Sequence, residues 1–423
     1  MKQTKIGLIP DDWNYVLLKD VAKFQQGYQI YFANQTKYKL PGFDRYLYIT
    51  DFYSDSNILF VKDSINYYHI SKKDICIANT GASAGKAFRN KTGILSNNMF
   101  KIFLSDKLDE DYAWCFFNSP LYGKELNEHL NSAGQPHVGH KNMGNMQIPL
   151  PPTVAEQQRI AKALSDVDTL ISTTEKLIQK KKNIKQGTMQ NLLTGKKRLP
   201  GFGPQTKSPD YKQTELGPIP EDWEVKSLNL LGTILRGVSY KPEDASEKKI
   251  SNYIPLLRSN NVFDSRINFS NLVYIKPHCV HQIQYMSYGD ILICAANGSA
   301  SLVGKNAYYN KTNTVTFGAF MSVFRCFENQ NHSFIRYLFQ TDLYKSYLKE
   351  ILAGSAINNL TPKNLLNLSF SLPSSLQEQT AIANVLSSMD KEIETLNTKL
   401  EKYRNLKTAM MQQLLTGKIR LVK

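Results

Sequence analysis

The chain has 423 residues, and 42% of them are hydrophobic, which is enough to build the cores of two or three domains. Lysine and arginine outnumber aspartate and glutamate by 52 to 36, and the resulting formal charge of +16 favours a polyanionic partner. No segment approaches the ~20 apolar residues that span a bilayer, and the initial sequence MKQTKIGLIPDDWNY lacks a continuous apolar segment, so we expect neither a membrane protein nor a secreted one.

The cysteines give a further exclusion. The five cysteines are scattered along the chain and contain no C-x-x-C pair, which argues against a zinc site and against a disulfide framework. We therefore expect a cytoplasmic protein without a metal site.

The sequence consists of two homologous halves. Lys2-Gln3-Thr4 and Asp12-Trp13 recur as Lys212-Gln213-Thr214 and Asp222-Trp223, at an offset of 210 residues. The offset rises to 216, to 219 and finally to 222, as three further pairs show: Asp74 with Asp290, Gly85 with Gly304, and Glu156 with Glu378. The starts and the final forty residues of the halves are close, whereas residues 24–110 and 234–330 barely align. We infer a shared framework and a variable reading part in each half.

Each half begins with a globular head. Short β-type segments at 46–49, 74–77, 253–257 and 290–294 are separated by Gly, Asn and Pro. One helix then follows in each head, predicted over about 111–130 and 333–352, because apolar and aromatic residues recur at helical spacing. Leu150-Pro151-Pro152 and Leu372-Pro373 mark a break, since proline is tolerated at a helix start but not in a helix interior.

A long helix follows each break, predicted over about 153–194 and 375–416. Each has an apolar seam at heptad-like spacing and ends at Thr-Gly, where glycine supplies a left-handed conformation. A helix of ~40 residues is ~60 Å long and cannot bury its seam alone, so we expect an antiparallel pair. The predicted residues of the helix-pair and partner interface are Ile160, Leu164, Val167, Leu170, Leu177, Ile382, Leu386, Met389, Ile393 and Leu400.

The predicted fold is therefore α+β. Two homologous mixed α/β heads are separated by a long antiparallel two-helix coiled coil and related by a pseudo-two-fold internal repeat. The predicted division is head 1 at 1–150, the first long helix at 151–199, head 2 at 200–372 and the second long helix at 373–423.

This plan resembles the specificity (S) subunit of type I restriction–modification systems over nearly the whole chain. The most specific motif is P-P-x-x-x-E-Q-Q-x-I at the start of the first long helix, and the motif L-L-T-G-K-x-R-L occurs at 192–199 and 414–421. The first motif comprises Pro151, Pro152, Glu156, Gln157, Gln158 and Ile160, and it is repeated as Pro373, Glu378, Gln379 and Ile382. A minor departure is Leu372-Pro373-Ser374, which stands where the first half has two prolines.

The resemblance implies a role for each part. Each head is a target-recognition domain for one half of an interrupted sequence in double-stranded DNA, and the helix pair sets the spacer. Two methyltransferase (M) subunits dock on the helical regions, and restriction (R) subunits join them for cleavage. S-adenosylmethionine, ATP and magnesium belong to those partners, so we expect no cofactor on this chain. Lys180-Lys181-Lys182 is interpreted as a solvated helix face that could help a partner to dock.

The sequence contains no convincing catalytic motif. Gly81 to Lys86 resembles a phosphate loop, but three residues lie between its glycines where four are required, and no Ser/Thr follows to hold magnesium. No G-x-G-x-x-G follows a predicted strand either. We therefore expect a non-catalytic subunit. Two alternatives stay open, namely a helical scaffold or adaptor and a basic protein that binds DNA regardless of sequence.

The candidate DNA contacts lie in loops of the heads. Arg and Lys pair with guanine and Asn and Gln with adenine, while Lys, Arg, Ser and Thr also bind phosphates. These residue types gather at 79–89 and 135–141 in head 1, and at 258–261, 297–305 and 358–359 in head 2. The predicted DNA-binding residues are Asn79, Thr80, Ser83, Lys86, Arg89, Gln135, His137, Lys141, Arg258, Asn260, Asn261, Asn297, Ser299, Ser301, Lys305, Asn358 and Asn359.

Overall fold

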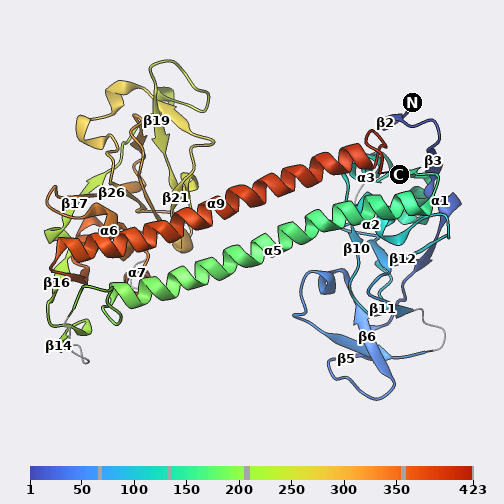
Figure 1. The fold of residues 1–423 in the computed structure, drawn as a ribbon, viewed down its shortest axis with the longest axis horizontal. Coiled ribbons are helices and arrows are strands. Elements are labelled where there is room, and N and C mark those ends of the chain that lie inside the picture. The colour runs from blue at the N-terminus through green and yellow to red at the C-terminus, as the bar shows by residue number, and fades with distance from the viewer. Residues whose placement is uncertain (65–68, 131–134, 204–209, 354–358, 422–423) are drawn as a thin grey trace. The chain divides into compact units, whose positions relative to one another are not determined.

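The computed structural model describes residues 1–64, 69–130, 135–203, 210–353 and 359–421. The chain forms two compact units: unit 1 comprises Met1–Leu177 and Leu396–Lys423, and unit 2 comprises Ile178–Thr395. Each unit contains one head and the adjoining parts of two long helices (Figure 1). We keep the names head 1 and head 2 for the globular parts within residues 1–150 and 200–372.

Head 1 is built on two small sheets. In the first, with strand order β10-β9-β12-β4, β12 is antiparallel to both β9 and β4. In the second, with strand order β5-β7-β6-β11-β8, β6 and β11 are parallel. The bounds are β4 Ala22–Gln26, β5 Gln35–Thr36, β6 Phe43–Leu47, β7 Leu59–Lys62, β8 His69–Ile70, β9 Ile75–Ala78, β10 Ala87–Phe88, β11 Gly93–Leu95 and β12 Met99–Leu104.

Head 2 repeats the orders β10-β9-β12-β4 and β5-β7-β6-β11, and its described residues add no counterpart of β8. Its sheets have the orders β17-β26-β23-β24 and β18-β22-β19-β25, and β19 and β25 form the parallel pair. The bounds are β17 Gly232–Arg236, β18 Ala245–Ser246, β19 Ile254–Leu257, β22 Val273–Ile275, β23 Ile291–Cys294, β24 Asn306–Tyr308, β25 Thr316–Phe317 and β26 Met321–Cys326. A small ribbon, β20 Val262–Phe263 with β21 Arg266–Ile267, is added. The internal repeat predicted from the sequence is thus confirmed in three dimensions.

The beginning of each head pairs with its end. β3 (Asn14–Leu17) pairs with β13 (Gln147–Leu150), and β16 (Trp223–Ser227) pairs with β27 (Ser369–Pro373). Two-stranded ribbons precede these ladders, namely β1 Lys2–Thr4 with β2 Gly7–Ile9, and β14 Tyr211–Thr214 with β15 Gly217–Pro220. Each ladder therefore closes its head directly before a long helix begins.

The helices of the heads differ from the sequence prediction, which placed one helix in each. Head 1 has α2 (Glu110–Phe117) and α3 (Pro120–His129), and head 2 has α6 (His332–Leu338) and α7 (Asp342–Ala353). The prediction of one continuous helix in each head was wrong because Ser119 and Thr341 each cap a new helix. Their hydroxyl oxygens accept hydrogen bonds from the amides of Tyr122 and Tyr344. The described parts of the heads also contain the short helices α1 Leu18–Val21, α4 Gly139–Asn145 and α8 Pro362–Leu366.

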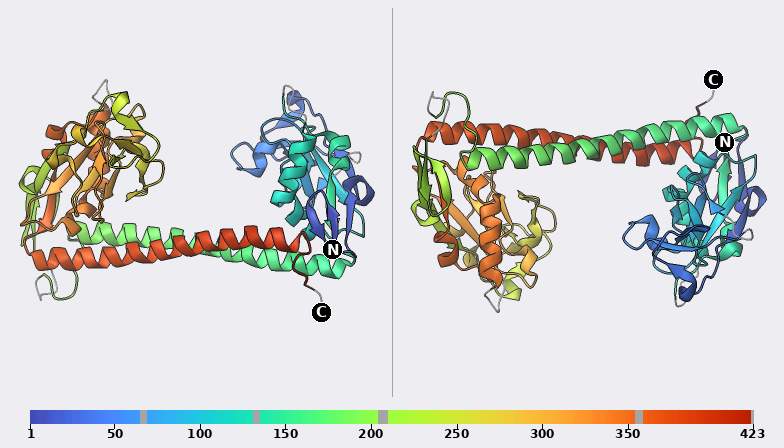
Figure 2. Two further views of the ribbon diagram at one scale, coloured as in Figure 1. Left: turned by 90° about the horizontal axis from the view of Figure 1, so that it is seen from above. Right: turned by 90° about the horizontal axis from the view of Figure 1, so that it is seen from below.

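The two long helices are confirmed as α5 (Val154–Leu193) and α9 (Leu376–Leu414). In unit 1, Glu175 pairs with Arg404 at 2.7 Å and Asp168 with Lys407 at 2.6 Å. In unit 2, Lys181 pairs with Glu392 and Lys185 with Asp390, both at 2.6 Å. Residue numbers rise along one helix as they fall along the other, so the helices are antiparallel in each unit, and Figure 2 shows them side by side. Gly195 and Gly417 follow the helices with φ of +69° and +67°.

Part of the predicted apolar seam was wrong. Ile160, Leu164, Val167, Ile382, Leu386, Ile393 and Leu400 are buried and Met389 is half-buried, whereas Leu170 is 45% exposed and Leu177 is 39% exposed. The seam of α5 continues through buried Thr174 and Ile178. Thr174 fits because its hydroxyl donates to the carbonyl oxygen of Leu170 at 2.7 Å. The seam position between Val167 and Ile178 is thus occupied by a polar residue.

Each head core extends into both long helices. In unit 1, Trp13 and Phe100 belong to a buried cluster that includes Ile160 and Leu164 of α5 and Met411 of α9. In unit 2, the equivalent cluster joins Trp223 and Phe324 to residues of both helices, namely Met189, Leu192, Leu193, Ile382, Ala383 and Leu386. Each head is thus packed onto the helix segments of its own unit.

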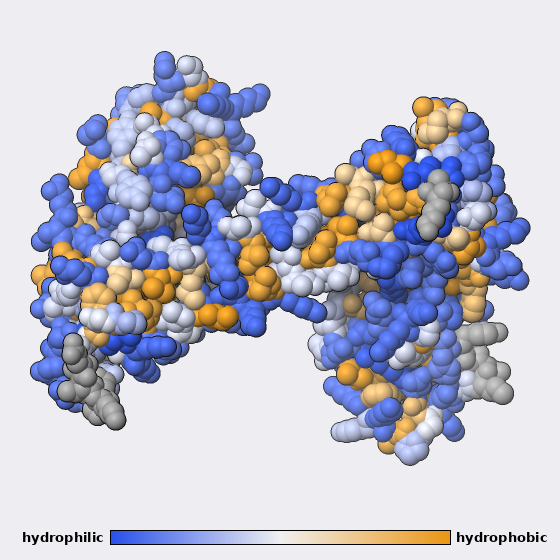
Figure 3. All heavy atoms as spheres, in the orientation of Figure 1, coloured by the Kyte–Doolittle hydropathy of each residue, from blue (hydrophilic) through white to orange (hydrophobic). Residues whose placement is uncertain are grey.

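Hydrophilic side chains cover most of the surface that Figure 3 shows, and apolar residues interrupt it in small patches. None of the helices among the described residues is both long and apolar enough to cross a membrane.

Candidate DNA interface

The first candidate loop of head 1 is the turn between β9 and β10. Backbone hydrogen bonds close it, because the amide of Gly85 donates to Ala78 at 2.8 Å and the amide of Ala78 donates to Lys86 at 3.0 Å. Gly85 has a φ of +81°, and a Cβ there would lie 2.2 Å from a methyl carbon of Leu126. The loop is therefore a fixed turn that is packed on α3.

The second candidate loop lies against the first. Thr80 and His137 form an isolated β-bridge, and the amide of Gly81 donates to the carbonyl oxygen of Pro136 at 2.9 Å. The buried side chain of Asn79 joins them further, because its Oδ1 accepts from the amide of Gly139 at 3.0 Å. Two sequence clusters that lie far apart in the chain thus form one surface.

The polar groups of this surface differ in accessibility. Lys86, Gln135, His137 and Lys141 are exposed, and Thr80 and Ser83 are half-buried. Arg89 instead packs its guanidinium 4.4 Å from the Trp114 ring centre and pairs with Asp111 at 2.7 Å. Asn79 and Arg89 therefore support the head through interactions within it.

Tyr53 is an exposed residue beside this surface that was not predicted from the sequence. Its hydroxyl lies 3.1 Å from the hydroxyl of Ser83, and the Lys86 ammonium lies 4.7 Å from its ring centre. The hydrogen bond with Ser83, assisted by Lys86, lowers the pKa of Tyr53. Tyr53 is one of 23 tyrosines and lies in no motif, so no sequence signal indicated this position.

Head 2 has the equivalent loop between β23 and β24. The amide of Gly304 donates to Cys294 and that of Cys294 to Lys305, both at 2.8 Å, as their counterparts do in head 1. Ala296 bridges to Asn359 as Thr80 bridges to His137. The loop is longer in head 2, which explains why the repeat offset rises from 216 to 219 between Asp290 and Gly304.

The candidate residues of this loop lie together. Asn297 donates to the Ser259 hydroxyl at 3.2 Å and accepts from the Ser299 amide at 3.0 Å. Ser299 and Ser301 share a hydrogen bond at 2.9 Å, and Lys305 and Asn359 are exposed. Asn358 lies outside the described residues.

The turn at 258–261 adjoins this loop through Ser259. Asn260 is exposed, and Arg258 is half-buried with an Nε that has no hydrogen-bond partner among the described residues. Asn261 is only 1% exposed: its Oδ1 accepts from the Arg258 amide, and its Nδ2 donates to the carbonyl oxygens of Asn268 and Ser270. The Asn261 side chain therefore fixes the turn.

Among the residues that the structure describes, one cluster of metal-ligand residue types occurs away from these loops. The ligand atoms of Asp244, His278 and Cys279 all lie within 4.8 Å of one another. The Asp244 carboxylate, however, pairs with the Lys276 ammonium at 3.0 Å, and a cation in the cluster would compete with that ammonium. We assign no metal to it.

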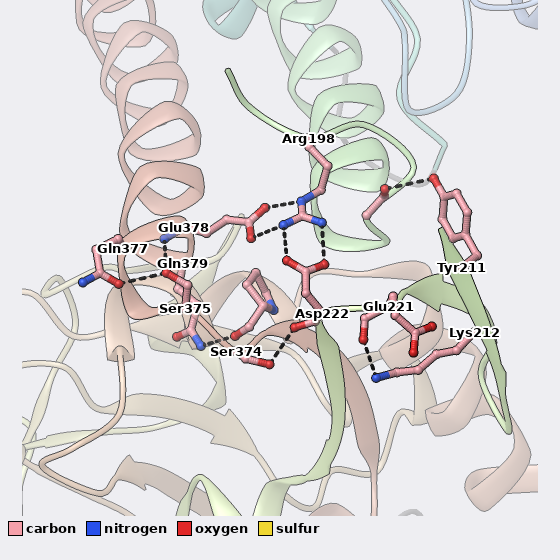
Figure 4. Close-up of polar contacts among 12 residues, drawn as sticks. Arg198, Tyr211, Lys212, Glu221, Asp222, Ser374, Ser375, Gln377, Glu378 and Gln379 are labelled. Atoms are coloured by element: carbon pink, nitrogen blue, oxygen red, sulfur yellow. Dashed lines mark hydrogen bonds and ion pairs between the residues drawn. The ribbon is translucent and has the colours of Figure 1, made fainter. Parts of the chain in front are cut away.

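Two arginines tie the ends of the long helices to the heads. Arg198, which follows α5, pairs with Asp222 at 2.8 Å and through Nη2 with Glu378 at 2.7 Å (Figure 4). In unit 1, Arg420 follows α9 and pairs in the same way with Asp12 at 3.1 Å and with Glu156 at 2.8 Å. We call these two groups the arginine clamps. Each lies beside a fully buried tryptophan, Trp223 or Trp13.

The profile of the type I restriction modification DNA specificity domain matches the chain twice, over residues 10–186 and 220–402. The MjaVIII specificity subunit of Methanocaldococcus jannaschii is 30% identical over 423 residues, which cover 98% of this chain and 94% of the relative. The chain belongs to the type I specificity subunit family. The EcoKI specificity subunit of Escherichia coli is also 30% identical, over 203 residues that cover 48% of this chain and 44% of the relative.

Solved structures agree with this specificity-subunit fold. A crystal structure of the S subunit from M. genitalium has a TM-score of 0.59 at 15% identity and covers 98% of each chain. A second chain, from a study of the assembly of a type I system, has a TM-score of 0.54 at 16% identity and covers 97% of this chain and 100% of its own.

A specificity subunit recognises the DNA target of its system and is not itself catalytic. Membership of this family decides against the two alternatives from the sequence, namely a helical scaffold or adaptor and a basic protein that binds DNA regardless of sequence. The cofactors of type I systems belong to the partner subunits.

Proposed function

We propose that each head reads one half of an interrupted DNA sequence through two loops that a β-bridge joins into one surface. The observation that carries this proposal is the equivalence of the two surfaces: Thr80 bridges to His137 in head 1, and Ala296 bridges to Asn359 in head 2. The backbone frame is shared, while the exposed side chains differ in kind and number. Such a frame suits two readers with different targets, because base edges are distinguished by side-chain donors and acceptors.

Within each surface we assign the exposed and half-buried polar groups at the loop surface to DNA, and the groups that are held by interactions within the head to support. In head 1 the proposed contacts are Thr80, Ser83, Lys86, Gln135, His137 and Lys141, with Tyr53 added. In head 2 they are Arg258, Asn260, Asn297, Ser299, Ser301, Lys305 and Asn359. Asn358, which lies outside the described residues, is proposed as a contact on the sequence alone. Asn79, Arg89 and Asn261 position the loops through their internal hydrogen bonds and ion pair.

We further propose the assembly that the family implies. Two M subunits dock on the helical regions 151–199 and 373–423, R subunits join for cleavage, and S-adenosylmethionine, ATP and magnesium are held by these partners. Leu170 and Leu177, which are exposed on α5, are candidates for the M-subunit contact. The helix pair sets the spacer between half-sites, since α5 and α9 each contribute to both units.

Mapping of methylated adenines tests the two-reader proposal. The S and M subunits are expressed together in a methylation-free host, and modified sites are located genome-wide. Exchange of residues 14–110 for those of a relative should change one half-site and leave the other half-site and the spacer unchanged. A change in both half-sites would contradict the assignment of one reader to each head.

A further inference from the structure

A wide cleft lies within unit 2, between head 2 and the long helices. Its volume is about 1300 Å³. Its lining residues come from α5 and α9, from the loop between β23 and β24, from α7 and from the β20–β21 ribbon, among other segments. We call it the unit 2 cleft. It was not visible in the sequence, because its lining comes from segments between Lys182 and Glu394.

The cleft is strongly basic. Nine of its lining residues are Lys or Arg and three are acidic, which leaves an excess of six positive charges. The basic residues are Lys182, Lys185, Arg266, Lys305, Lys311, Arg336, Lys345, Lys349 and Lys391, and the acidic ones are Asp264, Asp390 and Glu394. Like charges that line one concave surface repel one another, so the arrangement favours a polyanion as occupant.

Only part of this charge is neutralised within the protein. Lys182 pairs with Asp264 at 2.8 Å, Lys185 and Arg336 share Asp390, and Lys345 pairs with Asp342. The remaining five, Arg266, Lys305, Lys311, Lys349 and Lys391, are exposed, and no residue that the structure describes forms an ion pair with them. They come from five different segments, so they offer spaced cations of the kind that a phosphate backbone requires.

The cleft is continuous with the proposed reading surface of head 2. Ser301 and Lys305 belong both to the candidate loop and to the cleft lining. The same lining also contains Lys349 on α7 and Lys391 on α9. A duplex that is read by the loop can therefore extend over cations that carry no base specificity.

We propose that the unit 2 cleft binds the phosphate backbone of the duplex whose half-site head 2 reads, and that α9 contributes to this interaction through Lys391. This inference rests on the proposed function of head 2. Because phosphates are the same at every sequence, the cleft adds affinity and holds the register of the duplex without adding base discrimination.

The salt dependence of binding distinguishes this role. The assembled S–M complex is prepared with wild-type chain, with K349A/K391A, and with K248A/K249A as a matched control of exposed head 2 lysines outside the cleft lining. Binding is measured by fluorescence anisotropy at several salt concentrations. The duplexes are the mapped target and the same duplex with the head 2 half-site scrambled.

For K349A/K391A we expect the same fold loss of affinity on both duplexes. The slope of log affinity against log salt should become shallower by about 0.9 for each phosphate that the variant no longer neutralises, while K248A/K249A should match wild type. Unchanged affinity and slope would overturn the proposal. A loss confined to the mapped target would also overturn it and assign base reading to these lysines. Unchanged DNA binding with weaker M-subunit association would overturn it as well, and would assign the cleft to an acidic protein segment instead.

Failure of the cleft proposal is separable from failure of the proposed function. Substitution of Asn297 and Ser299 should change the mapped head 2 half-site. If it does not, the loop assignment fails, whereas the salt slope of K349A/K391A still decides whether the cleft binds phosphates.

Discussion

Arg420 and Glu156 form an ion pair in unit 1 although 264 residues separate them in the sequence, with Nη2 and Oε2 at 2.8 Å. Arg198 and Glu378 repeat the pair in unit 2 at 2.7 Å. Each arginine follows one long helix, and each glutamate lies in the first turn of the other. The arginine clamps thereby explain why the E-Q motif and the T-G-K-x-R motif occur together in the chain: each motif supplies one partner of the same ion pair.

Removal of the Arg198 clamp should be costly. Glu378 is 1% exposed, so Arg198→Ala leaves a buried carboxylate without its cation, and such a loss costs about 3–5 kcal/mol. The matched control is Lys197→Ala, which removes one exposed positive charge from the adjacent position. Urea unfolding of both variants gives the free energies. Equal effects of the two substitutions would show that the clamp contributes nothing specific.

The clamps should also weaken in acid. Hydrogen bonds from Arg420 and Arg198 hold the pKa values of Asp12 and Asp222 below the ordinary value of 3.8. A lowered pKa in the folded state means that the stabilisation is complete above pH 3.8 and is lost as the pH falls below that value. Thermal unfolding between pH 5 and about pH 3 should therefore show a steeper loss for wild type than for D12N/D222N. Asp106→Asn, at an exposed carboxylate, should keep the wild-type slope.

The corrected seam predicts a sharp contrast between two leucines of α5. Leu164 is 0% exposed, and its replacement by alanine should cost about 2–5 kcal/mol because it creates a cavity in the core. Leu170 is 45% exposed, and Leu170→Ala should stay within about 0.5 kcal/mol. Chemical denaturation of the two variants measures both. A large loss of unfolding free energy for Leu170→Ala would show that Leu170 belongs to the buried seam.

The length of the helix pair should set the length of the spacer between the two half-sites. Because the clamps hold both ends of the pair, we expect that α5 and α9 must be lengthened together, by four residues after Gln179 and four after Thr395. Four residues are close to one helical turn and add about 6 Å, so the spacer should grow by one or two base pairs while both half-sites stay the same. Methylation mapping measures the spacer. An active double-insertion variant with the wild-type spacer would show that the helix pair does not set the spacer length.

A variant with the insertion in α5 alone serves as the control for the double insertion. It makes the two helices unequal in length, so the two arginine clamps cannot both form without distortion. We therefore expect this variant to lose methylation. Full activity of the single insertion would show that the clamps tolerate helices of unequal length.

The sequence by itself determined the repeat, the two long helices and the loops that carry the candidate residues. These depend on local signals: the recurrence of Asp12-Trp13 as Asp222-Trp223, the prolines before each long helix and the glycines after it. Local signals did not suffice where a single residue changed the course of a helix or of its apolar seam. Ser119 divided a predicted helix by capping a new one, and Thr174 is buried in the seam of α5 although the exposed Leu170 and Leu177 had been predicted there.

Only the tertiary structure decided which of the candidate residues share a surface. It joined loop 79–86 to 135–141, placed Tyr53 beside Lys86, and directed Asn261 into the head, away from solvent. It also assembled the unit 2 cleft from both long helices and from head 2. The physical reason is that hydrophobicity and backbone preference are properties of neighbouring residues, whereas burial, ion pairing and shared charge arise between residues that only folding brings together.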